Sequence, residues 1–420
     1  TFATLMAGGG SGEVAVPGDS TASTLYKVVA HLAEPNMPPK KPRIPDAEIA
    51  VLKKWIEGGL VESKGGAARK GKGLKVDLAL ASVPRGAPEG PPPLPQDLLL
   101  EPVIRTAKAE AVTAMAASPW APLVAVAGPR QILLYHTGTL QLAGILPFPE
   151  PRIHALKFSR NGKLLLAGGG RGAKKGIAVL YDVVTGDRVA EIGDEHDLVL
   201  ACDLSADQKL IALGGPSRTV KIYSVQDGEL LHAIKKHTDW VTAIEFSPDG
   251  ALLATGDRNG GFHIWEAARG GLYNSLNGHK GGITGLSWRG DSTLLASGSE
   301  DGQIMLWESK GGTRVKNWRA HSEVTSVEYG MDGRLVSSGR DRLVRSWKGD
   351  GAKLLDFEAF SDLALRAVFT HDGARVVGGS WTGEIRVWNG ADGKRIGELT
   401  TNPPALAEQI AEAAKKLAEA

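Results

Sequence analysis

A histidine, a serine and an aspartate recur together in the second half of the chain, and these are the residue types of a hydrolytic triad. The clearest set is His279, Ser297 and Asp301, which Trp307 follows. A nucleophile needs one special site, whereas this group recurs, each time with a tryptophan as its fixed fourth member. We therefore interpret the histidines as buried groups that satisfy polar atoms of turns, and we expect no catalytic residue among them.

No other pattern in the sequence indicates an enzyme. It contains no histidine cluster with metal-ligand spacing, no phosphate-binding loop and no nucleophile elbow. The glycine run at residues 168–170 precedes Arg171 and Lys174, but it lies between expected strands rather than before a helix, so it predicts a loop and not a nucleotide site. The one cysteine, Cys202, excludes an internal disulfide and any site that needs several thiolates from this chain.

Met37 is a second residue that could do chemistry, because it stands between prolines in a segment that joins two expected helices. Asp19-Ser20 can cap the first helix and Asp46 the second, and apolar residues at helical spacing follow each cap. The expected apolar faces are Leu25, Val28, Val29 and Leu32 in the first helix, and Ile49, Leu52, Trp55 and Ile56 in the second. On composition alone, a methionine in such a place fills a gap in a core.

The recurring histidine, serine, aspartate and tryptophan belong to an internal repeat of the sequence, which predicts repeated strands. Apolar-alternating segments begin at Val112, Ile153, Val199, Val241, Ile283, Val324 and Ala364, at spacings of 40 to 46 residues. This period is typical of β-propellers. In the clearest unit, residues 241–246 alternate with period two and predict a strand, and residues 252–255, 262–265 and 272–276 predict three more. The sequence therefore predicts a mainly β protein with a seven-bladed propeller over residues 101–402.

The sequence does not decide which segment closes the ring. A blade buries its faces only against its neighbours, so the last blade must meet the first. Two segments are candidates for the outer strand of the last blade: residues 102–106, before the first unit, and residues 394–399, after the last.

The units resemble those of the WD-repeat family over most of the chain. The strand-ending tryptophan of that family is present as Trp265, Trp307, Trp347 and Trp388, and tyrosine replaces it as Tyr135, Tyr181 and Tyr223. The resemblance implies a structural hydrogen-bond chain in each of three units: His279, Ser297, Asp301 and Trp307; His321, Ser338, Asp341 and Trp347; and His237, Thr255, Asn259 and Trp265. The early units lack the histidine, which leaves their blade joints less defined.

Residues 1–62 resemble the planctomycete-type c-type cytochrome domain. The elements that carry this resemblance occur in order, as Leu5-Met-Ala-Gly-Gly-Gly, Val16-Pro-Gly-Asp, Leu25-Tyr, Met37-Pro-Pro and Ala50-Val-Leu-Lys-Lys-Trp-Ile. The resemblance implies that Met37 is the distal iron ligand of a haem c, and that the protein is periplasmic or lies at the cell surface. The attachment motif Cys-x-x-Cys-His is absent from residues 1–420 and would belong just upstream. Either the complete protein carries haem c, with His31 as an alternative ligand, or the module is a haemless relic.

Two segments flank the propeller without belonging to a repeat. Residues 63–100 begin Gly-rich and basic and end Pro-rich, which predicts a linker; nucleic acid or anionic lipid is the less favoured reading, because no aromatic residue interleaves the lysines. Residues 403–420 predict a helical tail. Its apolar positions follow a heptad pattern, which leaves the start of a coiled coil, and a homo-oligomer, as open alternatives: Leu406, Ile410, Ala413 and Leu417.

The composition narrows the classes of function. With 420 residues, 23% of them charged and 42% hydrophobic, the chain is too apolar to be disordered, and it contains no apolar run long enough to cross a membrane. The formal net charge of +2 gives no argument for nucleic acid as a partner. We expect a non-enzymatic scaffold that binds other proteins and is linked to a cytochrome module. The alternative is haem-dependent electron transfer in which the propeller docks redox partners; an enzyme with its site in the propeller channel is the least favoured hypothesis.

Overall fold

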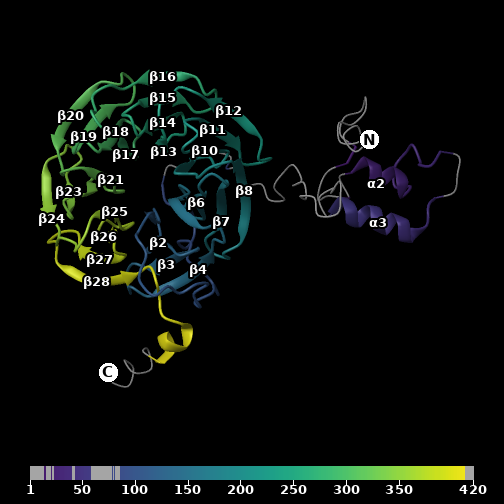
Figure 1. Ribbon diagram of the computed structural model, residues 1–420, viewed down its shortest axis with the longest axis horizontal. Helices are drawn as coiled ribbons and strands as arrows, with labels where there is room; N and C mark the ends of the chain where they lie inside the picture. The colour runs from purple at the N-terminus through teal and green to yellow at the C-terminus, as the bar shows by residue number, and fades with distance from the viewer. Residues whose placement is uncertain are drawn as a thin grey trace. The chain divides into compact units, whose positions relative to one another are not determined.

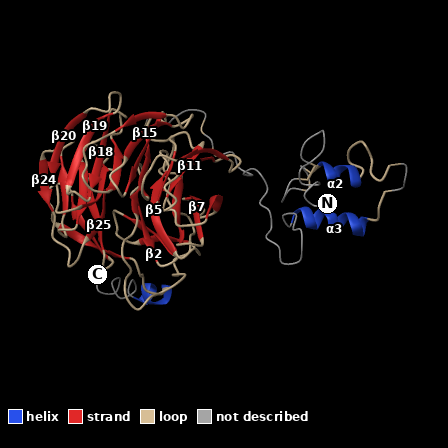
Figure 2. Ribbon diagram, turned by 45° about the horizontal axis from the view of Figure 1, so that its top comes forward, coloured by secondary structure: helices blue, strands red, loops and turns tan. Residues whose placement is uncertain are grey.

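The computed structural model describes residues 14–15, 20, 23–39, 43–57, 78, 80 and 86–411. The chain divides into two compact units, residues 1–75 and residues 76–420, and each is considered by itself. The larger unit is a ring of strands, and α2 (Thr24–Val29) and α3 (Asp46–Glu57) lie in the described part of the smaller unit (Figure 1). Seen from a second direction, the ring consists almost entirely of strands and loops (Figure 2).

The larger unit is a seven-bladed β-propeller, which confirms the prediction from the repeat spacing. Each blade is a four-stranded antiparallel sheet in which the strands follow one another in chain order, and the first strands of neighbouring blades contact one another around the central channel. Because neighbouring strands are antiparallel, the loops alternate between two faces. We call the top face the one that carries the loops leading into each first strand and the loops between second and third strands. The bottom face carries the remaining loops.

The blades are numbered 1 to 7 in chain order. The strands of blades 1 to 4 are β1 (Met115–Ala117), β2 (Leu123–Gly128), β3 (Gln131–His136), β4 (Leu142–Pro147); β5 (Arg152–Phe158), β6 (Leu164–Arg171), β7 (Lys175–Asp182), β8 (Arg188–Glu195); β9 (Ala201–Leu204), β10 (Leu210–Gly214), β11 (Val220–Ser224), β12 (Leu230–Ile234); and β13 (Val241–Phe246), β14 (Leu252–Asp257), β15 (Phe262–Glu266), β16 (Leu272–Ser275). Those of blades 5 to 7 are β17 (Ile283–Trp288), β18 (Leu294–Ser299), β19 (Gln303–Glu308), β20 (Arg314–Arg319); β21 (Val324–Tyr329), β22 (Leu335–Gly339), β23 (Val344–Trp347), β24 (Lys353–Asp356); and β25 (Ala364–Phe369), β26 (Arg375–Ser380), β27 (Glu384–Asn389), β28 (Arg395–Thr400).

The hydrophobic core lies between the blades rather than inside them. One cluster joins blades 1 and 2 and includes Phe148 and Tyr181, and another joins blades 4 and 5 and includes Phe262 and Trp307. Further clusters join blades 3 and 4, 5 and 6, and 6 and 7 in the same way. A single sheet cannot bury both of its faces, so this stacking of neighbours stabilises the ring.

The ring closes between blades 7 and 1. The outer strand of blade 7 is β28, so residues 394–399 supply it and residues 102–106 do not. One apolar cluster spans this joint with side chains from both blades. Outside the sheets, the Asn402 side chain accepts a hydrogen bond from the Thr106 amide at 3.1 Å and donates one to the Thr106 carbonyl at 2.6 Å. The two ends of the propeller chain are therefore tied together beside the joint.

Residues 86–100, which we call the strap, lie against the propeller, although the sequence predicted a linker over residues 63–100. The Gln96 amide donates to the Val184 carbonyl at 2.9 Å, and Leu94 and Leu98 pack against the core between blades 1 and 2. Burial of these leucines favours docking over a free linker. Apart from Leu80, whose amide donates to the Asp207 carbonyl at 2.8 Å, and residue 78, the rest of the predicted linker lies outside the described residues.

The smaller unit contains α2 (Thr24–Val29) and α3 (Asp46–Glu57). Ala15 and Ile56 are buried between them, packed by parts of Leu25, Tyr26, Leu52 and Trp55. The expected core position of Leu32 is wrong: it is 69% exposed, because α2 ends at Val29 and the chain turns at His31, where φ is +59°. Asp19 lies outside the described residues, and Ser23 occupies the N-cap of α2. The cytochrome resemblance stays a prediction.

The predicted helical tail begins in the described part of the chain, where residues 406–411 are helical. Glu408 pairs with Arg105 at 3.0 Å, and Gln409 Nε2 donates to the Leu100 carbonyl at 3.2 Å. Ile410 is 60% exposed, while the heptad positions Ala413 and Leu417 lie outside the described residues. The coiled coil stays a prediction.

Candidate functional site

The structure brings the four predicted residues of blade 5 together as a buried tetrad. Trp307 Nε1 lies 2.8 Å from Ser297 Oγ, which lies 2.8 Å from His279 Nε2, and His279 Nδ1 lies 3.0 Å from Asp301 Oδ2. An indole nitrogen can only donate and a carboxylate can only accept, so each group in this series donates to the next. Ser297 is fully buried and already serves both neighbours, so the tetrad is a structural brace and not a nucleophilic triad.

The electrostatics of this tetrad fit a neutral histidine beside an ionised aspartate. Burial lowers the pKa of His279, against the opposing effect of Asp301. Burial alone would raise the pKa of Asp301, but hydrogen bonds from the Lys280 and Gln303 amides and from His279 hold it below its usual value. The brace is therefore complete at neutral pH without a charged imidazole.

In blade 6 the predicted Ser338 is wrong, and Ser337 is the member of the tetrad. Both His321 Nε2 and Trp347 Nε1 lie within 2.9 Å of Ser337 Oγ, and His321 Nδ1 lies 2.8 Å from Asp341 Oδ1. Ser338 bonds instead to hydroxyls of β21, because successive side chains of a strand point to opposite faces. The correct serine stands ten residues before the tryptophan, as it does in blade 5, and this spacing could have identified it.

In blade 4 the predicted Asn259 is wrong as the acidic partner. His237 Nδ1 lies 2.9 Å from Asp257 Oδ2, and His237 Nε2 and Trp265 Nε1 both reach Thr255 Oγ1, at 2.8 and 2.7 Å. Asp257 follows Thr255 by two residues, so the two side chains share one face of the strand. Asn259 instead donates its backbone amide to Asp257 at 2.9 Å and its side-chain amide to Thr238 Oγ1 at 3.2 Å.

Blades 1 to 3 use tyrosine where blades 4 to 6 use the tetrad, and sequence reasoning missed its role. The Tyr135 hydroxyl donates to the Thr400 carbonyl of blade 7, and the Tyr181 hydroxyl donates to the Pro147 carbonyl of blade 1, both at 2.8 Å. Each bond crosses a blade joint. The early joints are therefore defined by tyrosine hydroxyls that reach the outer strand of the preceding blade.

Blades 3 and 7 each replace the histidine with another residue. Glu195 stands four residues before Val199, as the histidines of blades 4 and 5 stand before their first strands, and it accepts hydrogen bonds from Tyr223 at 2.9 Å and Lys221 at 2.8 Å. In blade 7 Phe360 packs edge-on against Trp388, with ring centroids 5.6 Å apart. Among the described residues Trp388 Nε1 has no hydrogen-bond partner. The residue at this place before the first strand therefore contacts the tryptophan or tyrosine of its blade in both cases, although its type changes from histidine to glutamate or phenylalanine.

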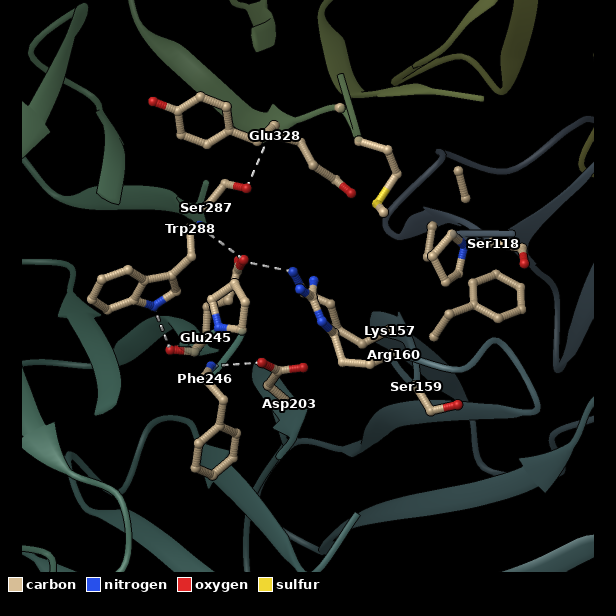
Figure 3. A pocket seen from close by; sticks show the side chains of 18 of the residues that line it. Ser118, Lys157, Ser159, Arg160, Asp203, Glu245, Phe246, Ser287, Trp288 and Glu328 are labelled. Carbon is tan, nitrogen blue, oxygen red and sulfur yellow. Dashed lines mark hydrogen bonds and ion pairs between the residues drawn. The ribbon is translucent and has the colours of Figure 1, made fainter. Parts of the chain in front are cut away.

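The central channel contains a second recurring position, on the first strands. It carries Lys157, Asp203, Glu245, Ser287 and Glu328 in blades 2 to 6, and all five line a cavity of about 140 Å³ that opens on the bottom face (Figure 3). Three of them accept a backbone N–H from the first strand of the next blade: Asp203 from Phe246 at 2.7 Å, Glu245 from Trp288 at 3.1 Å, and Ser287 from Tyr329 at 2.9 Å. This position therefore links neighbouring blades around the channel.

The charges of the channel are coupled. Lys157 Nζ lies 2.9 Å from Glu245 Oε2. Burial raises the pKa of Asp203 to about 7, against the attraction of Lys157, and burial likewise raises the pKa of Glu328 to about 7. Carboxyl groups with such values suit general acid–base chemistry. Asp203, however, already accepts the Phe246 amide, and Glu245 beside it accepts the Trp288 amide and pairs with Lys157, so these two carboxylates act as structural links between blades.

The described residues show no metal centre in the channel or elsewhere. Among them, no group of three or more His, Cys, Asp or Glu side chains is arranged to hold a metal ion. Cys202 is buried in β9, and burial raises the pKa of its thiol, so it is neither a ready ligand nor a nucleophile.

Met37 lies in the smaller unit, on the turn between α2 and α3. Its amide donates to the Val28 carbonyl at 3.0 Å, and its carbonyl lies 3.1 Å from His31 Nε2. The residue is 41% exposed and does not belong to the apolar cluster around Ile56. It therefore does not fill a gap in the described core, which was the alternative from composition.

Comparison with known families identifies three of the repeats. The model of the WD domain, G-beta repeat, matches residues 228–266, 270–308 and 312–348, and each match contains one of the three tetrads. The chain thus contains WD repeats within its seven-bladed propeller, an architecture that typically serves as a scaffold for protein interactions. A comparison with curated proteins gives no match. No helix in the described ranges is long and apolar enough to cross a membrane.

Proposed function

We propose that this protein is a non-enzymatic scaffold that binds other proteins through its WD-repeat propeller, outside the cytoplasm, and that its N-terminal unit is a c-type cytochrome module. One observation supports the scaffold function. The histidines, serines and aspartates that could act in catalysis are hydrogen-bonded to one another in the buried tetrads, while large apolar side chains are exposed on loops. Trp240 is 42% exposed and Trp381 is 57% exposed. Exposed tryptophans are enriched where proteins bind one another.

A cross-linking experiment tests the scaffold function. A photoreactive amino acid replaces Trp381 on the top face or, in a second variant, Lys348 on the bottom face, and each full-length chain is irradiated in the cells that produce it. We expect a discrete adduct with another protein from at least one face, identified by mass spectrometry and displaced by excess unlabelled chain. The absence of a displaceable adduct at both faces would contradict the proposal.

The alternative function is haem-dependent electron transfer, and the placement of Met37 favours it. The Met37 side chain is 41% exposed, on a proline-flanked turn, and does not belong to the apolar cluster between α2 and α3, so it is accessible to a ligand. Haem c, if bound, supplies an iron that exchanges electrons, and a thioether ligand raises its reduction potential. The chain itself would contribute Met37 as distal ligand, with the His31 ring holding the Met37 carbonyl.

An absorbance comparison tests this alternative. A longer chain that includes the expected upstream Cys-x-x-Cys-His is purified with and without Met37→Ala, and Met331→Ala, a half-exposed methionine of the propeller, is the matched control. We expect a covalently held haem in all three, and loss of the sulfur-to-iron charge-transfer band in Met37→Ala alone. Identical spectra would leave Met37 without a ligand role, and a chain without any haem would remove this function.

The extracytoplasmic setting rests on the resemblance to c-type cytochromes. Fractionation of the producing cells, with a cytoplasmic and a periplasmic marker measured in parallel, tests it. The chain should follow the periplasmic or surface marker.

A further inference from the structure

In blades 2 and 3 the chain that precedes the propeller contacts the bottom face. The strap contacts the bottom-face loops of blade 2, where the Gln96 amide bonds to Val184 and Pro93 lies beside Gly162. Leu80 contacts the bottom-face loop of blade 3 in the same way. The top-face loops of blades 2 to 4 carry no such segment among the described residues, so they are the open surface of this part of the ring.

A group of basic side chains occupies this open surface. They lie on four top-face loops of adjacent blades, they are all exposed, and we call them the basic crescent: Arg171, Lys174, Lys175, Arg218, Lys236 and Arg258. Among the described side chains, no carboxylate lies within ion-pair distance of any of them. The crescent therefore gathers six exposed basic side chains that form no ion pair with a described side chain.

Two described acidic residues that border the crescent, Asp197 and Asp239, accept backbone amides. Asp197 Oδ1 accepts the amides of Ala173 at 3.1 Å and Leu198 at 2.7 Å, and Asp239 Oδ1 accepts the amide of Trp240 at 2.7 Å. These bonds order the loops, and neither carboxylate forms an ion pair with a side chain of the crescent. They also fix the loops in place before any partner arrives, which lowers the entropy lost on binding.

An aromatic side chain stands inside the crescent. The Arg258 guanidinium lies over the Trp240 ring, 5.3 Å from its centroid, and the Arg258 amide donates to the Trp240 carbonyl at 2.9 Å. The cation–π contact holds the ring against the loop of blade 4 while leaving it partly exposed. The surface thus combines a rigid apolar anchor with surrounding positive charge.

We infer that the basic crescent binds an extended, Asp- and Glu-rich segment of a partner protein, and that an apolar side chain of this segment packs on Trp240. The inference rests on the proposed scaffold function and names the chemistry of its partner. A polypeptide fits better than a single-stranded nucleic acid, because proteins that bind single strands stack successive bases on several aromatic side chains. The crescent as defined here contains one such side chain, Trp240.

The test measures binding of defined probes to the full-length chain by fluorescence anisotropy. The probes are an end-labelled Glu-rich peptide with one central leucine, a Lys-rich peptide of the same length, and a single-stranded DNA with the same number of charges. We expect the Glu-rich peptide to bind, with an affinity that falls as salt is added, and the other two to bind more weakly. DNA that binds as tightly as the Glu-rich peptide would overturn the assignment to a protein partner.

Matched variants locate the binding surface. The triple change Lys174→Glu, Lys175→Glu and Lys236→Glu should weaken the Glu-rich peptide by roughly tenfold or more, because three favourable charges become unfavourable. The control changes net charge equally with bottom-face lysines: Lys310→Glu, Lys348→Glu and Lys394→Glu. It should leave binding nearly unchanged. Equal losses in the two triple variants would show a general charge effect and overturn the site.

A second pair of variants tests the anchor and separates the two proposals. Trp240→Ala should weaken the peptide while Trp381→Ala does not, and equal behaviour would overturn the role of Trp240. If the crescent variant still forms the same cross-linked adduct as the unaltered chain, the scaffold function stands and the crescent is not its site. If no adduct forms in any chain but the peptide binds as expected, the scaffold function fails while the anionic-peptide site remains.

Discussion

Two tryptophans in equivalent positions allow the hydrogen bond of the tetrad to be measured apart from packing. Trp307 in blade 5 and Trp388 in blade 7 are both buried, and each has an aromatic neighbour, Phe262 or Phe360, in edge-on contact. Trp307 Nε1 donates to Ser297 at 2.8 Å, whereas Trp388 Nε1 has no partner among the described residues. Replacing either one with phenylalanine removes the same atoms of the indole, although Trp388 also packs against Phe357, with ring centroids 5.3 Å apart.

The expected difference between the two variants is the value of one buried hydrogen bond. Trp307→Phe should cost about 1 kcal/mol more free energy of unfolding than Trp388→Phe, since a neutral hydrogen bond contributes about that much and its loss leaves Ser297 with fewer partners. For scale, Trp307→Ala should cost roughly 3–5 kcal/mol, the range for truncating a buried tryptophan.

Calorimetric unfolding of the full-length chain measures both effects, with Trp381→Ala, an exposed tryptophan on the top face, as the control. The control should shift the transition by little, since exposed substitutions stay within about 0.5 kcal/mol. The reasoning would be refuted by equal costs for Trp307→Phe and Trp388→Phe, or by an unchanged transition for Trp307→Ala.

Three further predictions follow from named contacts. Asp257→Ala should cost roughly 3 kcal/mol, because it removes the acceptor of the buried His237 and of three part-buried backbone amides, those of Thr238, Asn259 and Gly261. Asn259→Ala should stay within about 0.5 kcal/mol, and urea unfolding compares the two variants. Tyr181→Phe should cost about 1 kcal/mol by removing a hydrogen bond across a blade joint, and Tyr273→Phe, a more exposed hydroxyl, should cost less in the same assay. Burial raises the folded-state pKa of Glu328 to about 7 from a usual 4.5, so its ionisation penalises the fold as pH rises. Glu328→Gln should therefore gain stability relative to the unaltered chain between about pH 4.5 and pH 7 and level off above, and a gain independent of pH would contradict this.

The architecture could be predicted because spacing alone encodes it. The seven starts of the repeat coincide with the seven blades, and in the clearest unit the predicted strand over residues 241–246 has the bounds of β13. The other three strands of that unit begin at the predicted residues 252, 262 and 272 and differ only at their ends. Alternation of apolar residues sets the strand, and turns rich in Gly and Asp set its limits, so both signals are local.

The members of the tetrads were harder to predict because they depend on side-chain direction. Ser337 and Ser338 are equally good hydroxyl donors by type, yet only one points toward His321. Asp257 and Asn259 differ in the same way, since only Asp257 shares the strand face with Thr255. In all three tetrads the serine or threonine lies ten residues before the tryptophan, and this spacing identifies the correct hydroxyl residue. The aspartate has no fixed spacing to the tryptophan, because it lies in the strand in one blade and in the turn in the others.

The strap could not be predicted from its composition. Proline and glycine next to basic residues are typical of linkers. The segment docks because Leu94 and Leu98 find a core surface between blades 1 and 2, a partner that lies far away in sequence. The channel residues escaped prediction for a related reason, since Lys157 and Glu245 are two repeats apart in the chain and meet only when the ring has closed.

The seven joints together show why a family model finds only some of the repeats. The matched segments each hold a His–Ser/Thr–Asp–Trp tetrad, whereas blades 1 to 3 and 7 fill the same positions with tyrosine hydroxyls, a glutamate–lysine pair or a phenylalanine edge-on to a tryptophan. Each solution satisfies a buried polar group or fills the same volume between neighbouring blades. A stable ring therefore requires a buried group at each of these positions between neighbouring blades, and several residue types can supply it. Because these braces lie inside the joints, the top-face loops are free to carry unrelated chemistry, such as the lysines of blades 2 and 4, without disturbing the fold.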